Sequence, residues 1–529
     1  MDALSTAHPT GLPPRDRSAA DGINDRNHPG RETPDDVEFR RITGRTHPDD
    51  CAALTELGAA LCRQRRIGQA EEVLVRALQI GPVASGRTLS KLATVRLIQG
   101  RSDEAVALVR RALAIDPTDA ALHSKLIGLM AYTEAADTSS IKGEQQAWAR
   151  SHARTGPRGA AGASRQTRKL RVGYLANDLR DGSVARAFAA IPRHANRDDF
   201  ETVCYSGAPA WDRASIDLCF QVDAWRTTRR LDDDALDAQI RRDRIDILVD
   251  LCGHMDHNRL PVIARRPAPV QLSGWGYTPG PGISGIDGLL TDRIVAPPGE
   301  RSLFPERLLD LPCAQYYQHP RSAPDPGPLP YQANGFLTLG CLNRVEKIGP
   351  AVSAAWAAIL RVLDDARLVL MDASFADPAM PAALLDRFNR LGITSHRITC
   401  LPRRSFDGYL AVHQGIDLAL DSWPHSGGLT TFDALWMGVP VVTLRGRHPL
   451  GRTSASLLHC VGLSELVAAD VDAYVAGVIA LARSTGHLAG LRTSLRRRIE
   501  RSPLGAAAAY TGAVEDVYRE AWHRWGATA

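Results

Sequence analysis

The residues best suited to chemistry in this chain lie between positions 421 and 433, where two glycines and two threonines follow a short apolar run. The order is Asp421-Ser-Trp-Pro-His-Ser-Gly-Gly-Leu-Thr-Thr-Phe-Asp433. It predicts a strand ending at Asp421, a Gly-Gly turn, and a helix opened by Thr430 and Thr431. Backbone N–H groups at such a helix start bind phosphate oxygens. Asp433, expected in the first turn, would cap the helix or accept a hydrogen bond from a ribose hydroxyl. Alone, the pattern fits an ordinary capped helix as well as an anion site.

Two series of alternating strands and helices must position this segment. Strands are expected at 170–176, 202–206, 245–251, 269–273 and 288–291 and, after a proline-rich gap at 320–330, at 335–341, 367–371, 397–400, 417–420 and 439–443. Most connections are long enough for a crossover, which favours parallel sheets with helices on both faces. Two consecutive doubly wound domains place a ligand cleft between them. Residues 507–525 are expected to form a closing helix.

Residues 51–155 have helical spacing that repeats after 35 positions. Small and apolar residues recur in the pairs Leu57 and Leu92, Gly58 and Ala93, Ala70 and Ala105, and Ala77 and Ala112. This pattern resembles tetratricopeptide repeats, in which small residues let two helices cross closely. Two unrelated helical hairpins are the alternative. Because two repeats are fewer than a free-standing array needs, we expect the repeats to pack against the following domains.

Composition and charge exclude several classes of protein. A chain of 529 residues is too long for a peptide hormone or a disulfide miniprotein, and 44% hydrophobic with 23% charged residues is ordinary for a globular protein. A net charge of +5 is too small to indicate a nucleic-acid partner. The nine cysteines are scattered without a C-x-x-C pair, and no run of about 20 apolar residues occurs. We therefore expect reduced thiols, a cytoplasmic location and no membrane partner.

The segment 421–443 resembles the donor-sugar loop of the O-linked N-acetylglucosamine transferase and SPINDLY family, glycosyltransferase family 41. Further matches follow in the family's order at 148–152, 171–178, 243–254, 266–277, 304–312 and 343–348, so the resemblance covers roughly residues 50–525. It implies an α/β fold of the GT-B type, with two Rossmann-like doubly wound domains behind tetratricopeptide repeats, as in bacterial members. The implied layout is a disordered segment at 1–50, repeats at 51–155, a linker at 156–168, a first Rossmann-like domain at 169–330 and a nucleotide-sugar-binding domain at 331–529.

The resemblance also implies an activity. The enzyme would transfer N-acetylglucosamine from UDP-GlcNAc to Ser or Thr hydroxyls of proteins, with inversion and without a metal or cofactor. The repeats would help to hold the acceptor polypeptide. His254 and His257 lie near each other in the sequence but match no standard zinc spacing, so no metal site is expected.

The same resemblance assigns roles to single residues. Lys347 is the only lysine after Lys169, and it falls where the family has the lysine that neutralises the donor diphosphate. A compact ammonium suits a leaving group that gains charge as the sugar departs. Asp178 and His254 are the other expected catalytic residues. The expected substrate-binding residues are Arg344, Tyr409, Gly427, Gly428, Leu429, Thr430, Thr431 and Asp433.

Several positions depart from the family's pattern. Gly182 stands where bacterial relatives have an active-site histidine, Ser426 where they have asparagine, and Arg344 where a glutamine is frequent. Leu429 replaces a frequent threonine. The missing histidine removes a group that orients the sugar. Two alternatives therefore stay open: the same fold with another donor such as GDP-fucose, or a degenerate family member that acts as a binding scaffold.

Overall fold

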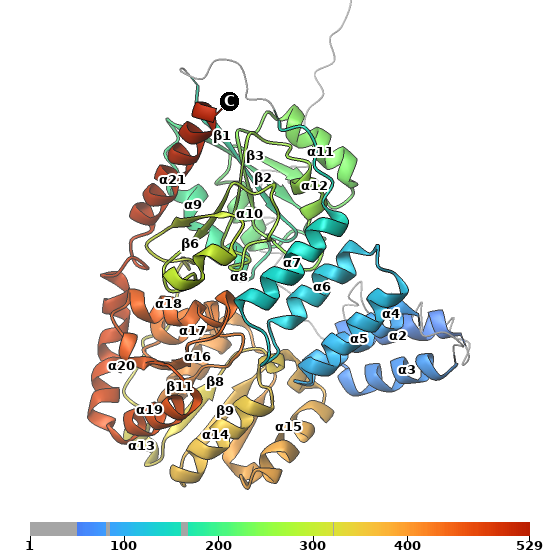
Figure 1. Ribbon diagram of the computed structural model, residues 1–529. Helices are drawn as coiled ribbons and strands as arrows, with labels where there is room; N and C mark the ends of the chain where they lie inside the picture. Colours follow the sequence, from blue (N-terminus) through green and yellow to red (C-terminus); the bar gives the residue numbers. More distant parts are fainter. Residues whose placement is uncertain (1–49, 81–84, 160–167, 321, 529) are drawn as a thin grey trace, which may run out of the picture.

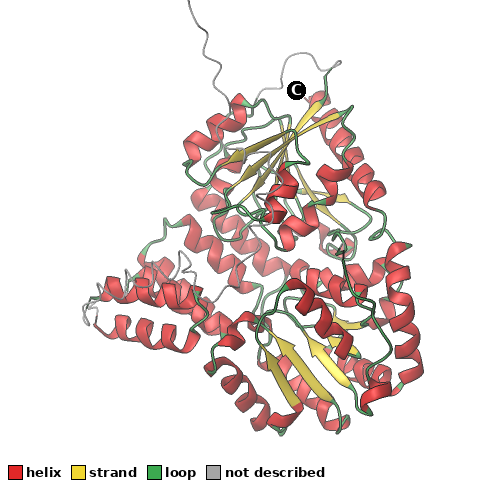
Figure 2. Ribbon diagram, turned by 180° about the vertical axis from the view of Figure 1, so that it is seen from behind, coloured by secondary structure: helices red, strands yellow, loops and turns green. Residues whose placement is uncertain are grey.

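The chain folds into a helical array and two α/β domains, and the computed structural model describes residues 50–80, 85–159, 168–320 and 322–528. Residues 1–49 of the expected disordered segment and 160–167 of the expected linker lie outside the described residues. The two sheets lie one above the other, and the helical array projects to one side (Figures 1 and 2). The prediction of two separate doubly wound sheets is confirmed.

The first sheet has seven parallel strands in the order β3-β2-β1-β4-β5-β6-β7. Their bounds are β1 Leu170–Ala176, β2 Phe200–Ser206, β3 Ala224–Thr227, β4 Ile247–Asp250, β5 Val270–Ser273, β6 Gly288–Thr291 and β7 Arg307–Asp310. β1 pairs with both β2 and β4, so Tyr174 lies between Cys204 and Val249. The strand order reverses between β1 and β4, and the loops after these two strands therefore open a crevice.

The second sheet has six parallel strands in the order β10-β9-β8-β11-β12-β13. Their bounds are β8 Thr338–Cys341, β9 Arg367–Met371, β10 Ile398–Leu401, β11 Leu418–Leu420, β12 Val441–Leu444 and β13 Val467–Ala468. Here the order reverses between β8 and β11. The loop after β8 carries Lys347, and the loop after β11 carries the Gly-Gly turn. The two segments singled out in the sequence thus meet at one topological switch point.

Helices cover both faces of each sheet. Those of the first are α8 Ser183–Phe188, α9 Ala190–His194, α10 Arg213–Cys219, α11 Asp233–Arg242 and α12 Leu260–Ala264. The helices that come after the first sheet in the chain are α13 Tyr331–Asn334, α14 Pro350–Val362, α15 Ala379–Arg390, α16 Phe406–Val412, α17 Leu429–Trp436, α18 Thr453–Cys460, α19 Val471–Arg483, α20 Thr485–Glu500 and α21 Ala507–Thr528.

The closing helix α21 belongs in space to the first sheet, although the sequence places it at the end of the second domain. Figure 1 shows it running alongside the first domain. Its buried Tyr510 hydroxyl accepts a hydrogen bond from Trp275 Nε1 at 2.9 Å, and its Tyr518 hydroxyl lies 3.4 Å from that of Tyr174 on β1. These aromatic side chains fill a face of the first sheet, so the chain must cross back to complete it.

Six helices precede the sheets: α2 Cys51–Arg63, α3 Ile67–Ile80, α4 Gly86–Ile98, α5 Ser102–Ile115, α6 Ala120–Met130 and α7 Thr138–His152. α2 packs on α3, and α4 packs on α5. A Cβ added at Gly58 would lie 2.4 Å from Leu74 Cγ, which explains the small residue at this crossing. Ala70 and Ala105 are fully buried at equivalent positions. The helical region is thus consistent with tetratricopeptide repeats.

The repeats contact both α/β domains, as expected for an array too short to stand alone. In α7, Lys142 pairs with Glu306 at 3.2 Å, and Gln145 donates to the Gly280 carbonyl at 2.8 Å. On the other side, the Gly68 amide of α3 donates to Asp377 of the second domain at 3.0 Å. The array therefore bridges the two domains.

Candidate active site

Lys347 lies at the end of a short 3-10 helix, Val345–Lys347, directly beside the Gly-Gly turn. Its Nζ donates to the Ser426 carbonyl at 2.7 Å, and the residue is only 8% exposed. Burial, reinforced by the charge of Arg344, lowers the pKa of Lys347 to about 7, although the Asp421 carboxylate opposes this shift. A lysine so placed gains its proton readily when an anion binds next to it.

The buried carboxylate of Asp421 holds the loop that follows β11. Its Oδ1 accepts from the Gly427 amide at 2.8 Å and from the Ser422 amide at 2.9 Å. Its Oδ2 accepts from the Thr443 hydroxyl of β12 at 2.6 Å. Asp421 therefore ties the start of the loop to the glycine turn and to the neighbouring strand.

The two glycines of the turn are packed too closely against their neighbours for any side chain to replace their hydrogen atoms. A Cβ at Gly427 would lie 2.2 Å from Thr431 Oγ1, and one at Gly428 would lie 2.7 Å from the Tyr317 hydroxyl. Gly428 is the N-cap of α17 and has no side chain to accept from the first N–H groups. The cap residue therefore takes up none of these N–H groups, which point to the site where an anion would bind at a helix start.

The threonines and Leu429 form the first turn of α17. The Thr431 hydroxyl is buried and lies 2.8 Å from the Ser454 hydroxyl of α18, whereas Leu429 and Thr430 are half-buried. Because the helix begins at Leu429, Asp433 lies in its second turn and not in the first as expected. Asp433 therefore does not cap the helix.

Asp433 instead forms an ion pair across the two domains. Arg186 of α8 donates from Nη1 to Oδ2 at 3.0 Å and from Nη2 to Oδ1 at 2.7 Å. Burial raises the pKa of Asp433, and the Arg186 charge opposes that shift. The Tyr409 hydroxyl is buried and lies near this carboxylate.

Arg344 points toward the repeats. It donates to the hydroxyl of Tyr132, in the turn between α6 and α7, and its guanidinium lies 5.8 Å from that ring. The Tyr132 ring in turn packs against His425, with ring centroids 4.9 Å apart. The end of the repeat region therefore borders the loop that carries the Gly-Gly turn.

In the first domain, Asp178 follows β1 at the crevice. It pairs with Arg180 at 2.6 Å, and, although burial acts in the opposite direction, hydrogen bonds from Arg180 keep the pKa of Asp178 below its usual value. Gly182 precedes α8 with extended backbone, φ −179°. A Cβ there would meet only the Arg180 carbonyl oxygen, at 3.6 Å.

His254 uses both ring nitrogens within the protein. Nδ1 lies 3.1 Å from the Ser124 hydroxyl of α6, and Nε2 lies 2.8 Å from the Pro281 carbonyl oxygen. The ring packs edge-on against Trp148 and is 2% exposed, and burial lowers its pKa to about 3. A neutral imidazole with both nitrogens in use joins the repeats to the first domain and offers no nitrogen to a substrate.

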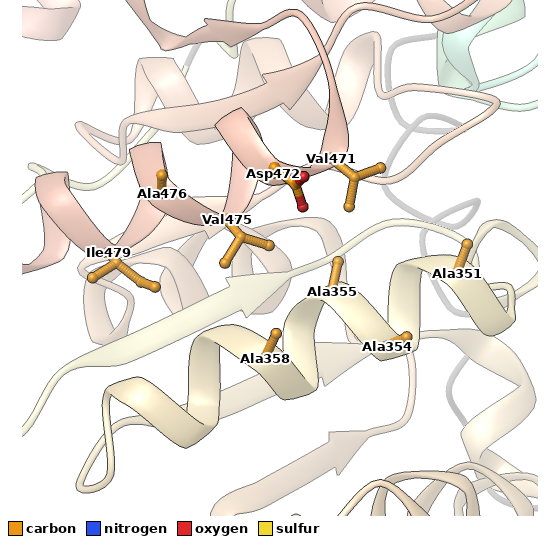
Figure 3. A pocket seen from close by; sticks show the side chains of 9 residues that line it. All are labelled: Ala351, Ala354, Ala355, Ala358, Val471, Asp472, Val475, Ala476 and Ile479. Carbon is orange, nitrogen blue, oxygen red and sulfur yellow. The ribbon is translucent and has the colours of Figure 1, made fainter.

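Two cavities lie outside this constellation. One, of about 570 Å³, is a groove between α14 and α19 (Figure 3), lined by Ala351, Ala354, Ala355, Ala358, Val471, Asp472, Val475, Ala476 and Ile479. It has no cationic group and does not suit a phosphate. The other, of about 580 Å³, includes Arg452, which pairs with Glu300 through both guanidinium ends.

The described part of the chain holds no group of three or more His, Cys, Asp or Glu residues arranged for a metal ion. Among its helices, none has the length and apolar character needed to cross a bilayer.

Sequence reasoning missed three residues of this site. Arg186 lies four residues after Gly182 on a short helix, and no local pattern indicates that it reaches Asp433, which is 247 positions away. Tyr132 lies in the repeat region, and its contact with Arg344 spans 212 positions. For Asp421 a signal did exist: an acidic residue that ends a buried strand needs partners, and the glycine amides supply them.

Comparison with known proteins adds an independent finding. The model of glycosyl transferase family 41 matches residues 158–319 and 329–514. A probable UDP-N-acetylglucosamine–peptide N-acetylglucosaminyltransferase SPINDLY of Solanum lycopersicum is 33% identical over 366 residues, which are 68% of this chain and 39% of the relative. The corresponding SEC protein of Arabidopsis thaliana is 26% identical over 372 residues, 67% of this chain and 37% of the relative.

Among solved structures, a lysine-to-methionine variant of Thermobaculum terrenum O-GlcNAc transferase superposes with a TM-score of 0.86. It is 32% identical, and the match covers 94% of this chain and all of that chain. The chain thus spans about two fifths of the SPINDLY relative but the whole length of the bacterial structure. The two stacked Rossmann-like domains have the GT-B arrangement that the resemblance implied.

Proposed function

Because this chain belongs to glycosyl transferase family 41, we propose that it transfers N-acetylglucosamine from UDP-GlcNAc to Ser or Thr hydroxyls of proteins. The observation that carries this proposal is the juxtaposition of Lys347 with the uncapped start of α17. Lys347 Nζ is bonded to the carbonyl of the residue that immediately precedes the two glycines. A lysine side chain and the N–H groups of a helix start, brought together at one point, suit a diphosphate.

In this proposal the donor diphosphate lies against the first turn of α17. The N–H groups of that turn and the Thr430 hydroxyl donate to phosphate oxygens, and the Lys347 ammonium neutralises charge that develops as the sugar leaves. These groups supply the compensation that a divalent cation supplies in other enzymes, so the proposed transfer is metal-independent. Tyr409 and Asp433 lie next to each other, and in this proposal they would contact the nucleoside or the sugar of the donor.

The proposed chemistry is a single displacement with inversion. The acceptor oxygen attacks the anomeric carbon from the face opposite the diphosphate, the bond to the diphosphate oxygen breaks, and the hydroxyl proton passes to solvent. Asp178, in the crevice of the first sheet, supplies a carboxylate on the acceptor side. We assign His254 a positioning role in place of the catalytic role that the resemblance implied, because both of its nitrogens have protein partners.

We further propose that the acceptor polypeptide runs from the repeats to the donor. The support is the contact of Tyr132 with both Arg344 and His425, which brings the end of the repeat region to the edge of the donor loop. A polypeptide held along the array would need no further domain to reach the cleft.

Calorimetric titration with UDP and with GDP tests the proposal and separates the alternatives. We expect UDP to bind and GDP to bind at least tenfold more weakly. Binding of GDP alone would favour a GDP-sugar donor, and binding of neither would favour the scaffold. Transfer of radiolabelled GlcNAc to proteins of a cell lysate, with Lys347→Met as the inactive reference, then tests turnover.

A further inference from the structure

Arg186 is a first-domain residue that makes its side-chain contacts outside that domain's sheet. Its guanidinium pairs with Asp433 of α17 through two parallel bonds of 3.0 and 2.7 Å. It also donates to the Gln318 carbonyl at 3.3 Å, in the segment that connects the domains, and it lies 5.1 Å from the Phe406 ring of α16. The side chains of Arg186 and Asp433 are 15% and 2% exposed.

Three groups face the Asp433 carboxylate, each from a different element. They are Arg186 from α8, the Tyr409 hydroxyl from α16, and Tyr317 from the connecting segment. Among these three, Arg186 carries the charge that balances the buried carboxylate. A forked, charge-assisted pair fixes both partners in orientation as well as in distance.

Net stability alone does not explain this ion pair. A buried ion pair contributes little net stability against its desolvation cost, and its best-attested use is to fix one arrangement among several. Here the two partners belong to different α/β domains, so the pair fixes the position of one domain relative to the other.

We propose that Arg186 is a positioning residue that latches the two domains over the donor and holds the Asp433 carboxylate against the sugar end of the nucleotide sugar. This rests on the proposed function, because Asp433 follows the α17 turn assigned to the diphosphate. In that arrangement the sugar would lie between the domains, next to the Arg186–Asp433 pair.

Two measurable consequences follow from the geometry. Loss of the fork frees α8 from α17, so amides of both helices exchange faster. Loss of the Arg186 charge also leaves burial unopposed at Asp433, which raises the pKa of that carboxyl further. Transfer that needs the carboxylate therefore loses activity at a higher pH in the variant than in the parent. We expect UDP affinity to change less than twofold while kcat/KM falls about tenfold or more.

The experiment compares the full-length parent with Arg186→Gln, Arg186→Lys and Arg197→Gln. Arg197 pairs with Asp223 at 2.7 Å inside the first domain and does not cross the cleft, so it serves as the matched control. Hydrogen exchange is followed in peptides that cover 183–188 and 429–436, with repeat peptides as a folding check. UDP affinity and the pH profile of transfer are measured on the same samples.

The latch predicts faster exchange in both cleft peptides and an acid limb at higher pH for Arg186→Gln. It predicts partial rescue by Arg186→Lys and parental behaviour of Arg197→Gln. Parental exchange and an unmoved acid limb in Arg186→Gln would overturn it. A parent that binds no UDP contradicts the proposed function instead, and the exchange measurement still decides on the latch because it needs no substrate. If Arg186→Gln does not fold, Arg186→Lys gives the same comparison at smaller amplitude.

Discussion

At the scale of single residues, Lys347 is a cation in surroundings that disfavour its charge. Its pKa of about 7 means that much of it is neutral at pH 8 in the free protein. A bound diphosphate brings negative charge and raises that pKa, so the lysine must take up a proton on binding. Lys347 thus becomes positively charged when the diphosphate binds.

Proton uptake on nucleotide binding is therefore our first prediction. At pH 8, UDP binding should take up close to one proton per site, roughly the fraction of Lys347 that is neutral in the free protein. Calorimetry in buffers of different ionisation enthalpy measures this number. In Lys347→Met the uptake should vanish, while Lys169→Met, at an exposed lysine, should behave like the parent. Equal uptake in the parent and in Lys347→Met would contradict the assignment.

The second prediction concerns turnover in the same variants. Lys347→Met should lower kcat by about 10²- to 10³-fold, because the departing diphosphate loses a preorganised positive charge. Initial rates of GlcNAc transfer at saturating donor measure the effect, with Lys169→Met again as the control. A rate within a few fold of the parent would mean that the phosphate site lies elsewhere.

Gly182 gives the third prediction. The backbone there is extended, and a Cβ makes only an ordinary contact, so the backbone before α8 accepts the Cβ of Gly182→His without strain. The new imidazole should raise transfer, or at least donor affinity, if it reaches an oxygen of the sugar or phosphate. The rate is measured beside the parent and Gly182→Ala, which adds the Cβ alone. Lower activity in Gly182→His only would show that this pocket has no room for the ring.

At the scale of elements, the loop after β11 depends on one carboxylate. Asp421 accepts from two amides and one hydroxyl while buried. Asp421→Ala leaves these donors without their acceptor, which should lower the free energy of unfolding by about 2–4 kcal/mol. Asp421→Asn keeps one oxygen for the amides and should lose less. Denaturant unfolding and UDP affinity check this fourth prediction, and an Ala variant as stable and as tightly binding as the parent would refute it.

The elements also show what the sequence could predict. The interior strands were found within a few residues because strands covered by helices on both faces are almost wholly apolar. The three strands without a prediction, β3, β7 and β13, are all at sheet edges. In β3 three residues are half-buried and one is exposed, and β13 has only two residues. The apolar pattern of both strands is therefore weak.

For the candidate site, local sequence patterns were enough to predict the parts that lie within a single loop. The Gly-Gly turn and the start of α17 are set by neighbouring residues and were predictable. The pairing of Arg186 with Asp433 and the double use of the His254 ring depend on segments brought together only by the packing of domains. No periodicity within a single stretch of sequence encodes such contacts.

At the scale of the whole molecule, a buried ion pair fastens the repeats to the first domain. The side chains of Lys142 and Glu306 are 3% and 0% exposed. Lys142→Met leaves Glu306 charged and buried without its partner, which should cost about 3–5 kcal/mol of unfolding free energy. The double variant Lys142→Met, Glu306→Gln should recover part of this loss. Thermal unfolding measures both, and an unaffected melting temperature in the single variant would contradict this fifth prediction.

The position of α21 has a consequence for how the protein is made. The ribosome releases the first sheet's strands some two hundred residues before the helix that covers one of its faces, since β7 ends at Asp310 and α21 begins at Ala507. Until then the surface that receives Tyr510 and Tyr518 stays uncovered during synthesis. The first α/β domain is thus translated before the second but cannot finish folding before it, and a chain cut short before Ala507 would expose that apolar face to chaperones and proteases.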